Sequence, residues 1–80
     1  MKARVHVTLK REVLDPQGDA VRRALVSLGF SGVRDVRVGK LVEIEFEGTD
    51  RARAEQELRA MCEKLLANAI IEEFAFEIVG

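Results

Sequence analysis

Residues 33–46 read VRDVRVGKLVEIEF, and this stretch decides the fold. From residue 36 on, apolar residues recur at every second position on both sides of the central Gly-Lys pair. Such alternation is typical of strands that bury one face. The stretch therefore predicts two neighbouring antiparallel strands, near residues 33–38 and 41–47, joined by a short connection.

We expect the connection between these strands to cover residues 39–41. A three-residue connection places Val38 opposite Val42 and Arg37 opposite Glu43, which keeps the apolar side chains of both strands on one face. A two-residue turn would shift the register by one residue and set apolar side chains opposite charged ones. We therefore predict the longer connection.

Both ends of the chain carry a strand pattern as well. Residues 3–9 alternate between apolar and polar side chains. Near the C-terminus, Phe74, Phe76 and Ile78 occupy one side of a second alternating segment. Each segment predicts a strand with one buried face.

Two helices are predicted between these strands. Asp15 can cap free backbone N–H groups, and Pro16 suits the first helical position because its missing N–H would be unpaired there. Gly29 can take the left-handed conformation that ends the first helix. Asp50 caps a second helix of about 17 residues, which ends at Asn68.

The element order is therefore β-α-β-β-α-β, which predicts an α+β fold of the ferredoxin-like type in a single domain, residues 1–80. This arrangement has an antiparallel four-stranded sheet of order 4-1-3-2. Each helix has one apolar stripe, so both helices should cover the same face of the sheet.

The other face of this sheet is predicted to be charged. Six side chains that alternate in sign from strand to strand form a candidate subunit-contact face: Arg4, His6, Arg37, Glu43, Glu45 and Glu77. One interpretation is a solvated face with cross-strand ion pairs. The other is a self-complementary surface, because a face bearing both signs can meet its own copy without net repulsion. We favour a homo-oligomer, a dimer or a tetramer, since 80 residues build only a small core.

Composition excludes several classes of protein. The net charge is −1 and the pI about 5.8, which argues against general nucleic-acid binding. No apolar run is long enough to predict a membrane span. A single cysteine cannot form an internal disulfide, so a cytoplasmic location is expected.

No catalytic, cofactor-binding or metal-binding residue is predicted. The sequence lacks a phosphate loop, because Arg34 stands where its first glycine would be and Leu41 follows Lys40. Cys62 lies on the apolar face of the second predicted helix, away from His6, the only histidine. A reactive cysteine needs a neighbouring base, and one histidine cannot build a metal site.

Three strings carry a resemblance to a known family: VHVTLK at residues 5–10, VLDPQG at 13–18 and MCEKLLAN at 61–68. With the residues between them, they closely resemble the PurS family over nearly the whole chain. That family is the small subunit of three-component phosphoribosylformylglycinamidine synthase, an enzyme of purine biosynthesis.

The resemblance implies a function that the residues alone do not. The complex converts formylglycinamide ribonucleotide to formylglycinamidine ribonucleotide with ATP and glutamine. Its glutaminase subunit releases ammonia, and its large synthetase subunit binds ATP and Mg²⁺. The small subunit, which has no cofactor, joins the two as an oligomer and supports ammonia transfer.

Two other classes of protein remain as alternatives. One is a ligand-sensing regulatory domain of ferredoxin-like topology that binds a small molecule between subunits. The other is an RNA-binding module, which the charged sheet face and the acidic pI disfavour.

Overall fold

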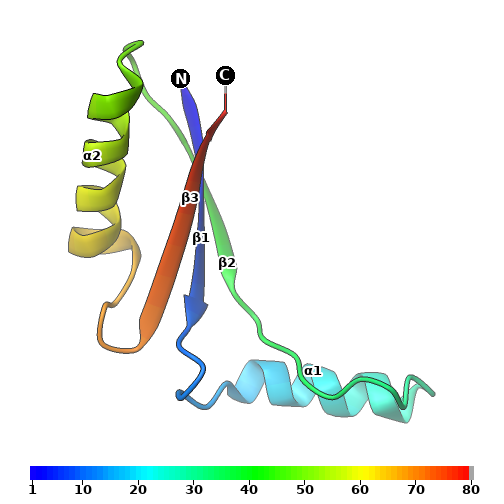
Figure 1. Ribbon diagram of the computed structural model, residues 1–80. Coiled ribbons are helices and arrows are strands. Elements are labelled where there is room, and N and C mark those ends of the chain that lie inside the picture. Colours follow the sequence, from blue (N-terminus) through cyan, green and yellow to red (C-terminus); the bar gives the residue numbers. More distant parts are fainter. Residues whose placement is uncertain (80) are drawn as a thin grey trace.

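A computed structural model describes residues 1–79 as a three-stranded sheet with two helices (Figure 1). In chain order the elements are β1 (Lys2–Leu9), α1 (Pro16–Ser27), β2 (Lys40–Glu45), α2 (Arg51–Met61), η1 (Cys62–Leu66) and β3 (Glu72–Val79). The segment η1 is a π-helical turn that continues α2. The α+β class predicted from the sequence is confirmed.

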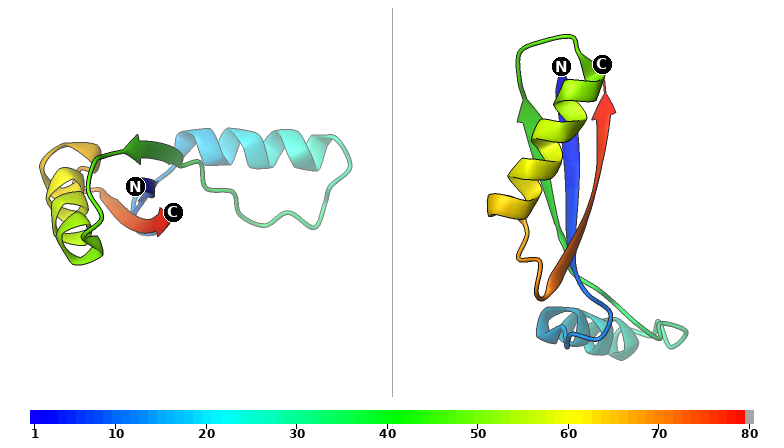
Figure 2. Two further views of the ribbon diagram at one scale, coloured as in Figure 1. Left: turned by 90° about the horizontal axis from the view of Figure 1, so that it is seen from above. Right: turned by 60° about the vertical axis from the view of Figure 1, so that its left-hand side comes forward.

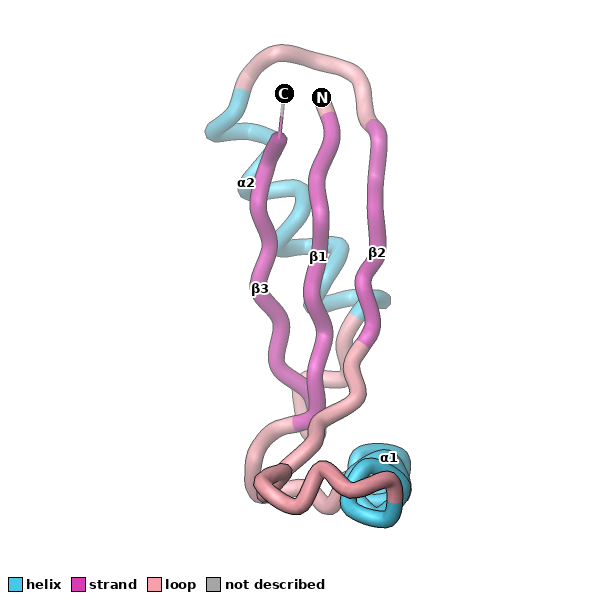
Figure 3. Tube along the Cα trace, turned by 90° about the vertical axis from the view of Figure 1, so that its right-hand side faces the viewer, coloured by secondary structure: helices cyan, strands magenta, loops and turns pink. Residues whose placement is uncertain are grey.

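The sheet is antiparallel, with strand order β2-β1-β3 (Figure 3). Val5 in the central strand lies opposite Val42 on one side and Phe76 on the other. The predicted neighbours of the first strand are therefore correct, because the strand after the Gly-Lys pair and the last strand both flank it. In this register, side chains that point to the same face of the sheet lie opposite one another, as the alternating pattern requires.

The strand predicted at residues 33–38 does not form. The predicted hairpin, with Val38 opposite Val42 and Arg37 opposite Glu43, is therefore wrong as well. Glu43 lies opposite Arg4 of β1 and has no strand partner at Arg37. The backbone N–H of Val38 instead donates to a carboxylate oxygen of Asp15 at 2.8 Å. A backbone donor that is bonded to a side chain in this way is not available to a strand partner within the chain.

The prediction that both helices cover one face of the sheet is also wrong. Among the described helices only α2 and η1 pack on the sheet, whereas α1 projects away from its lower end (Figures 1 and 2). The molecule measures 48 × 27 × 14 Å with a radius of gyration of 16.0 Å. A compact chain of this length would have a radius of gyration of about 12 Å. The described chain therefore consists of a small packed layer and a protruding part, residues 10–39, which we call the arm.

The hydrophobic core lies between the sheet and α2. Val5, Val7, Leu58 and Cys62 are its largest fully buried side chains. Apolar residues of β2 and β3 pack around them but stay partly exposed. A core this small gives limited stability.

Helix ends follow the sequence signals closely. Asp15 accepts a hydrogen bond from the N–H of Gly18 at 2.9 Å, and Asp50 accepts one from Arg53 at 3.2 Å. Gly29 has φ +105°, a conformation that favours glycine, just after α1 ends. The predicted caps and the length of the second helical segment are confirmed.

Candidate functional site

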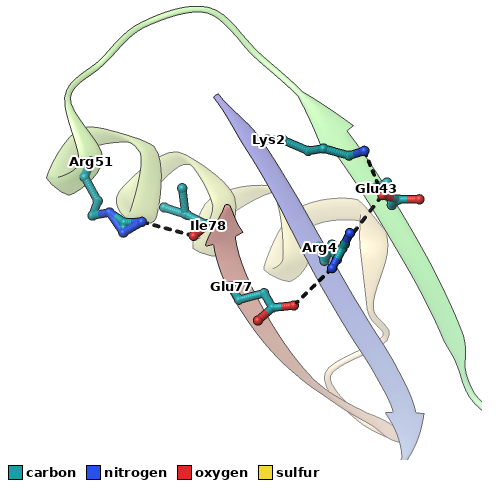
Figure 4. Close-up of polar contacts among 6 residues, drawn as sticks. All are labelled: Lys2, Arg4, Glu43, Arg51, Glu77 and Ile78. Carbon is teal, nitrogen blue, oxygen red and sulfur yellow. Dashed lines mark hydrogen bonds and ion pairs between the residues drawn. The ribbon is translucent and has the colours of Figure 1, made fainter. Parts of the chain in front are cut away.

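The outer face of the sheet, opposite α2, carries a row of ion pairs across all three strands (Figure 4). Lys2 Nζ lies 3.1 Å from Glu43 Oε2, and Arg4 Nε lies 3.6 Å from the same oxygen. Arg4 Nη1 also lies 4.0 Å from Glu77 Oε1. Side-chain donation from Lys2, with the positive charges of Lys2 and Arg4, lowers the pKa of Glu43. These pairs are half-exposed, so solvent screens them and each is weak alone.

His6 and Glu45 share this face, as predicted, but stand apart from the ion pairs. His6 lies between Leu41 and Ala75 in the register, and Glu45 lies opposite Lys2. Leu41 is 53% exposed, which leaves an apolar side chain beside the histidine. The structure thus places five of the six candidate residues on one face and mixes apolar surface with the charges.

Arg37, the sixth candidate residue, does not lie on the sheet face, and that prediction is wrong. Its guanidinium donates from Nη1 to the carbonyl oxygen of Val13 at 2.7 Å and from Nη2 to that of Arg11 at 2.8 Å. Two donors from one rigid group therefore tie the segment after α1 to the loop before it. The arginine serves to hold the arm.

Asp15 joins the same two segments. One carboxylate oxygen accepts from the N–H of Gly18 and the other from the N–H of Val38, and the whole of Asp15 is 7% exposed. These backbone donors, with the positive charge of Arg37, lower the pKa of Asp15. We call these four residues, Asp15, Gly18, Arg37 and Val38, the latch. Sequence reasoning found the cap but missed the bond to Val38, because that bond joins residues 23 apart.

Gly18 is part of the latch because no side chain fits there. A Cβ atom at this position would overlap the carbonyl oxygen of Val36 and lie 2.9 Å from a carboxylate oxygen of Asp15. The backbone at residue 36 therefore passes directly over the first turn of α1. The DPQG string at residues 15–18 has a structural explanation in this close approach.

An apolar groove runs between β2 on one side and the C-terminal part of α2 with η1 on the other. Its apolar lining residues are Ile44, Ala60, Met61, Leu65 and Leu66, with Glu57 and Lys64 also bordering it. Leu65 is 82% exposed. Water covers this apolar surface in the isolated chain, which is the unfavourable situation that association relieves.

Metal ligands and the single cysteine, Cys62, are the groups of this chain that catalysis most often uses. No three His, Cys, Asp or Glu side chains gather closely enough there to hold a metal ion. Cys62 is buried, and burial raises the pKa of its thiol, which favours the unreactive protonated form. The helices in this range are too short and too polar to span a membrane.

Comparisons with known proteins agree on one family. The PurS family model, described as phosphoribosylformylglycinamidine (FGAM) synthase, matches residues 2–80. The chain is 51% identical over 77 residues to phosphoribosylformylglycinamidine synthase subunit PurS of Synechocystis sp., covering 96% of this chain and 77% of that protein. It is 48% identical to the subunit of the same name from Bacillus subtilis, over 96% of this chain and 90% of that one.

Solved structures give the same result. The crystal structure of B. subtilis PurS has a TM-score of 0.87 at 47% identity, covering 99% of this chain and 98% of that one. A chain in the structure of PurLQS from Thermotoga maritima has a TM-score of 0.88 at 28% identity, covering 98% and 95%. The protruding arm therefore occurs within a shape that is shared along nearly the full length of these chains.

Proposed function

Because the chain belongs to the PurS family of phosphoribosylformylglycinamidine synthase subunits, we propose that it is the small, bridging subunit of that enzyme. The enzyme makes formylglycinamidine ribonucleotide from formylglycinamide ribonucleotide, ATP and glutamine. In this proposal the chain works in the cytoplasm, joins the glutaminase subunit to the large synthetase subunit, and supports the transfer of ammonia between them. ATP and Mg²⁺ bind to the synthetase.

The observation that supports this proposal most is that residues 1–79 expose several surfaces suited to binding but gather few groups suited to catalysis. Residues 1–79 offer no metal cluster, and their one cysteine is buried, yet they expose an arm, a groove and a charged sheet face. A chain of this kind acts through contacts. The relative from T. maritima is named as part of PurLQS, which is a partnership of the kind proposed here.

The alternative of a ligand-sensing regulatory domain is not supported. The curated relatives are named as subunits of the synthase, and none carries a regulatory name. The groove beside β2 is an open furrow lined mainly by apolar side chains, and Glu57 and Lys64 are the only charged residues among those that line it. Small-molecule sites normally combine concavity with several such groups.

We also propose that the subunit is a homo-oligomer, a dimer or a tetramer, and that the outer sheet face lies at or near a subunit contact. Four of its charged residues, Lys2, Arg4, Glu43 and Glu77, are paired with each other, so a second surface can approach without leaving these four unpaired. Exposed Leu41 supplies apolar surface beside His6. Contacts of this kind combine a polar rim with a few apolar anchors.

Co-purification tests the bridging role. The tagged chain should retain both the glutaminase and the synthetase from the same organism. These two partners should associate with each other less tightly when the chain is left out. Equal association of glutaminase and synthetase with and without the chain would refute the bridging role.

A further inference from the structure

We propose that the free edge of β3 binds an extended segment of the synthetase subunit, which adds to the sheet as a further strand. That segment carries apolar side chains on the face towards α2 and basic side chains on the outer face. This inference rests on the bridging function proposed above and specifies one of the two contacts that the function requires. We assign the segment to the large synthetase subunit, because the larger partner has more chain from which such a segment can come.

The edge of β3 is long and lacks the usual protection. β3 is the outermost strand on one side of the sheet, and within the described chain it pairs only with β1 (Figure 3). The pairing runs without a break from Val79, opposite Lys2, to Glu72, opposite Leu9. The strand contains no proline and no lysine. Bulges, prolines and lysines normally keep an edge strand from pairing further, so this edge is suited to a partner.

Hydrogen bonds show which backbone groups of β3 face away from β1. The N–H of Lys10 donates to the carbonyl oxygen of Ile71 at 2.9 Å, so residue 71 faces the first strand. Because backbone groups alternate along an antiparallel strand, the odd-numbered residues of β3 face β1 and the even-numbered ones face outward. The bond from Arg51 Nη2 to the carbonyl oxygen of Ile78, at 3.0 Å, agrees with this pattern (Figure 4).

Phe74 and Phe76 form the open middle of this edge. At its two ends, the outward N–H of Glu72 and the outward carbonyl oxygen of Ile78 are already bonded within the chain. Among the described residues, no hydrogen bond joins the outward groups of Phe74 or Phe76 to another segment. These two residues therefore offer N–H and C=O groups in succession, which is the main-chain pattern by which an extended peptide adds to a sheet.

The charges of β3 disfavour a second β3 as the occupant. The strand has three glutamates and no cationic residue. Glu73 and Glu77 share its outer face; Glu77 has Arg4 at 4.0 Å, whereas Glu73 lies opposite uncharged Thr8. Two β3 strands side by side would bring three glutamates from each copy together, and like charges on neighbouring strands are destabilising. Basic side chains beside Glu73 and Glu77 are attracted instead, which gives the added segment its basic face.

The other face of the same edge is apolar. The rings of Phe74 and Phe76 stack with their centroids 6.4 Å apart, and both side chains stay partly exposed at the border of the core. Apolar side chains of an added strand would lie beside these rings and bury more of their surface. The edge therefore fits a segment in which apolar and basic residues alternate.

Methylating one backbone nitrogen tests strand addition without changing any side chain. Cys62 is the only cysteine, so residues 62–80 can be made as a peptide and joined to residues 1–61 by ligation at that cysteine. The test chain carries N-methyl-Phe76, which lacks the outward N–H and places a methyl group where the added strand would lie. The control chain carries N-methyl-Ala69, in the exposed turn before β3.

The unmodified chain and the N-methyl-Ala69 chain should bind the purified synthetase equally well, and the N-methyl-Phe76 chain about tenfold more weakly. All three should bind the glutaminase alike. Equal affinity of the three chains for the synthetase would overturn strand addition, and so would a loss of affinity for the glutaminase alone. An unmodified chain that does not bind the synthetase would refute the bridging function as well.

A second pair of variants decides the question if the methylated chain does not fold. Glu73→Lys places a cation on the outer side of the edge, and Glu55→Lys makes the same charge change at an exposed position of α2. Glu73→Lys should weaken binding to the synthetase about fivefold more than Glu55→Lys at low salt, and the difference should shrink at high salt. Equal effects of the two variants would refute the proposed contact at β3.

Discussion

Replacing Gly18 with alanine tests whether the latch holds the arm. The new Cβ atom would overlap the carbonyl oxygen of Val36 and press on the carboxylate of Asp15. The obstructing atom belongs to the backbone, so no side chain can rotate away to make room. Either the first turn of α1 or the segment after it must move, and the bond from Val38 to Asp15 is then lost.

Two effects of opposite sign decide the magnitude. Alanine is a better helix former than glycine by up to about 1 kcal/mol, which favours the variant. Forcing an extra carbon into a filled space costs about 1–3 kcal/mol, and a rigid backbone neighbour puts this site at the upper end. The net loss of stability should be about 2 kcal/mol, which lowers the Tm of a chain this short by about 8–16 °C.

Thermal unfolding followed by circular dichroism, at one fixed protein concentration, measures this loss. The matched control is Gly32→Ala, because a Cβ there meets nothing within 4 Å and the backbone needs no positive φ. That control should be neutral or stabilise the chain by up to about 1 kcal/mol. Equal Tm values for Gly18→Ala and Gly32→Ala would refute the account of the latch.

Three further predictions concern other parts of the molecule. Native protein should react slowly with a thiol reagent, because Cys62 is fully buried, and rapid labelling would contradict this burial. Cys62→Ser should lower the free energy of unfolding in urea by about 1–3 kcal/mol, because it places a hydroxyl in an apolar site. The pKa of Asp15 lies below its ordinary 3.8 in the folded chain, so its stabilising effect is present above that pH and is lost as the pH falls. The Tm should therefore fall as the pH is lowered through 3.8 and below, and it should fall less steeply for Asp15→Asn; parallel profiles would count against the latch. Glu43→Arg should weaken any association through the outer sheet face, which light scattering at low and high salt measures; an unchanged mass would place the subunit contact on another surface.

The strands and helices whose positions depend on short-range sequence patterns could be predicted. Alternation from Ala3 to Leu9 predicted β1, and the side chains of Asp15 and Asp50 predicted where the two helices begin. The pairing of the first strand with the strands on either side also followed from the expected topology. These features depend on neighbouring residues, so the sequence carries them locally.

The place of the arm was not predictable from such patterns. Residues 33–38 have the alternation of a strand, but Arg37 and Val38 are bonded to a loop more than 20 residues earlier. An alternating pattern shows which side chains favour burial. It does not show which segment buries them, or whether that segment belongs to the same chain. The same limit explains why Arg37 was assigned to the sheet face, whereas Arg4, Glu43 and Glu77 were placed correctly: their pairing depends on strand register alone.

Synthesis of formylglycinamidine ribonucleotide by the purified glutaminase and synthetase, with and without this chain, tests the central claim most directly. Each reaction is run with glutamine and, separately, with ammonium salt as the nitrogen source. A subunit that joins the two enzymes and supports ammonia transfer should be required for the glutamine-dependent rate and should change the ammonium-dependent rate little. Glutamine-dependent synthesis that proceeds equally well without the chain would contradict the account.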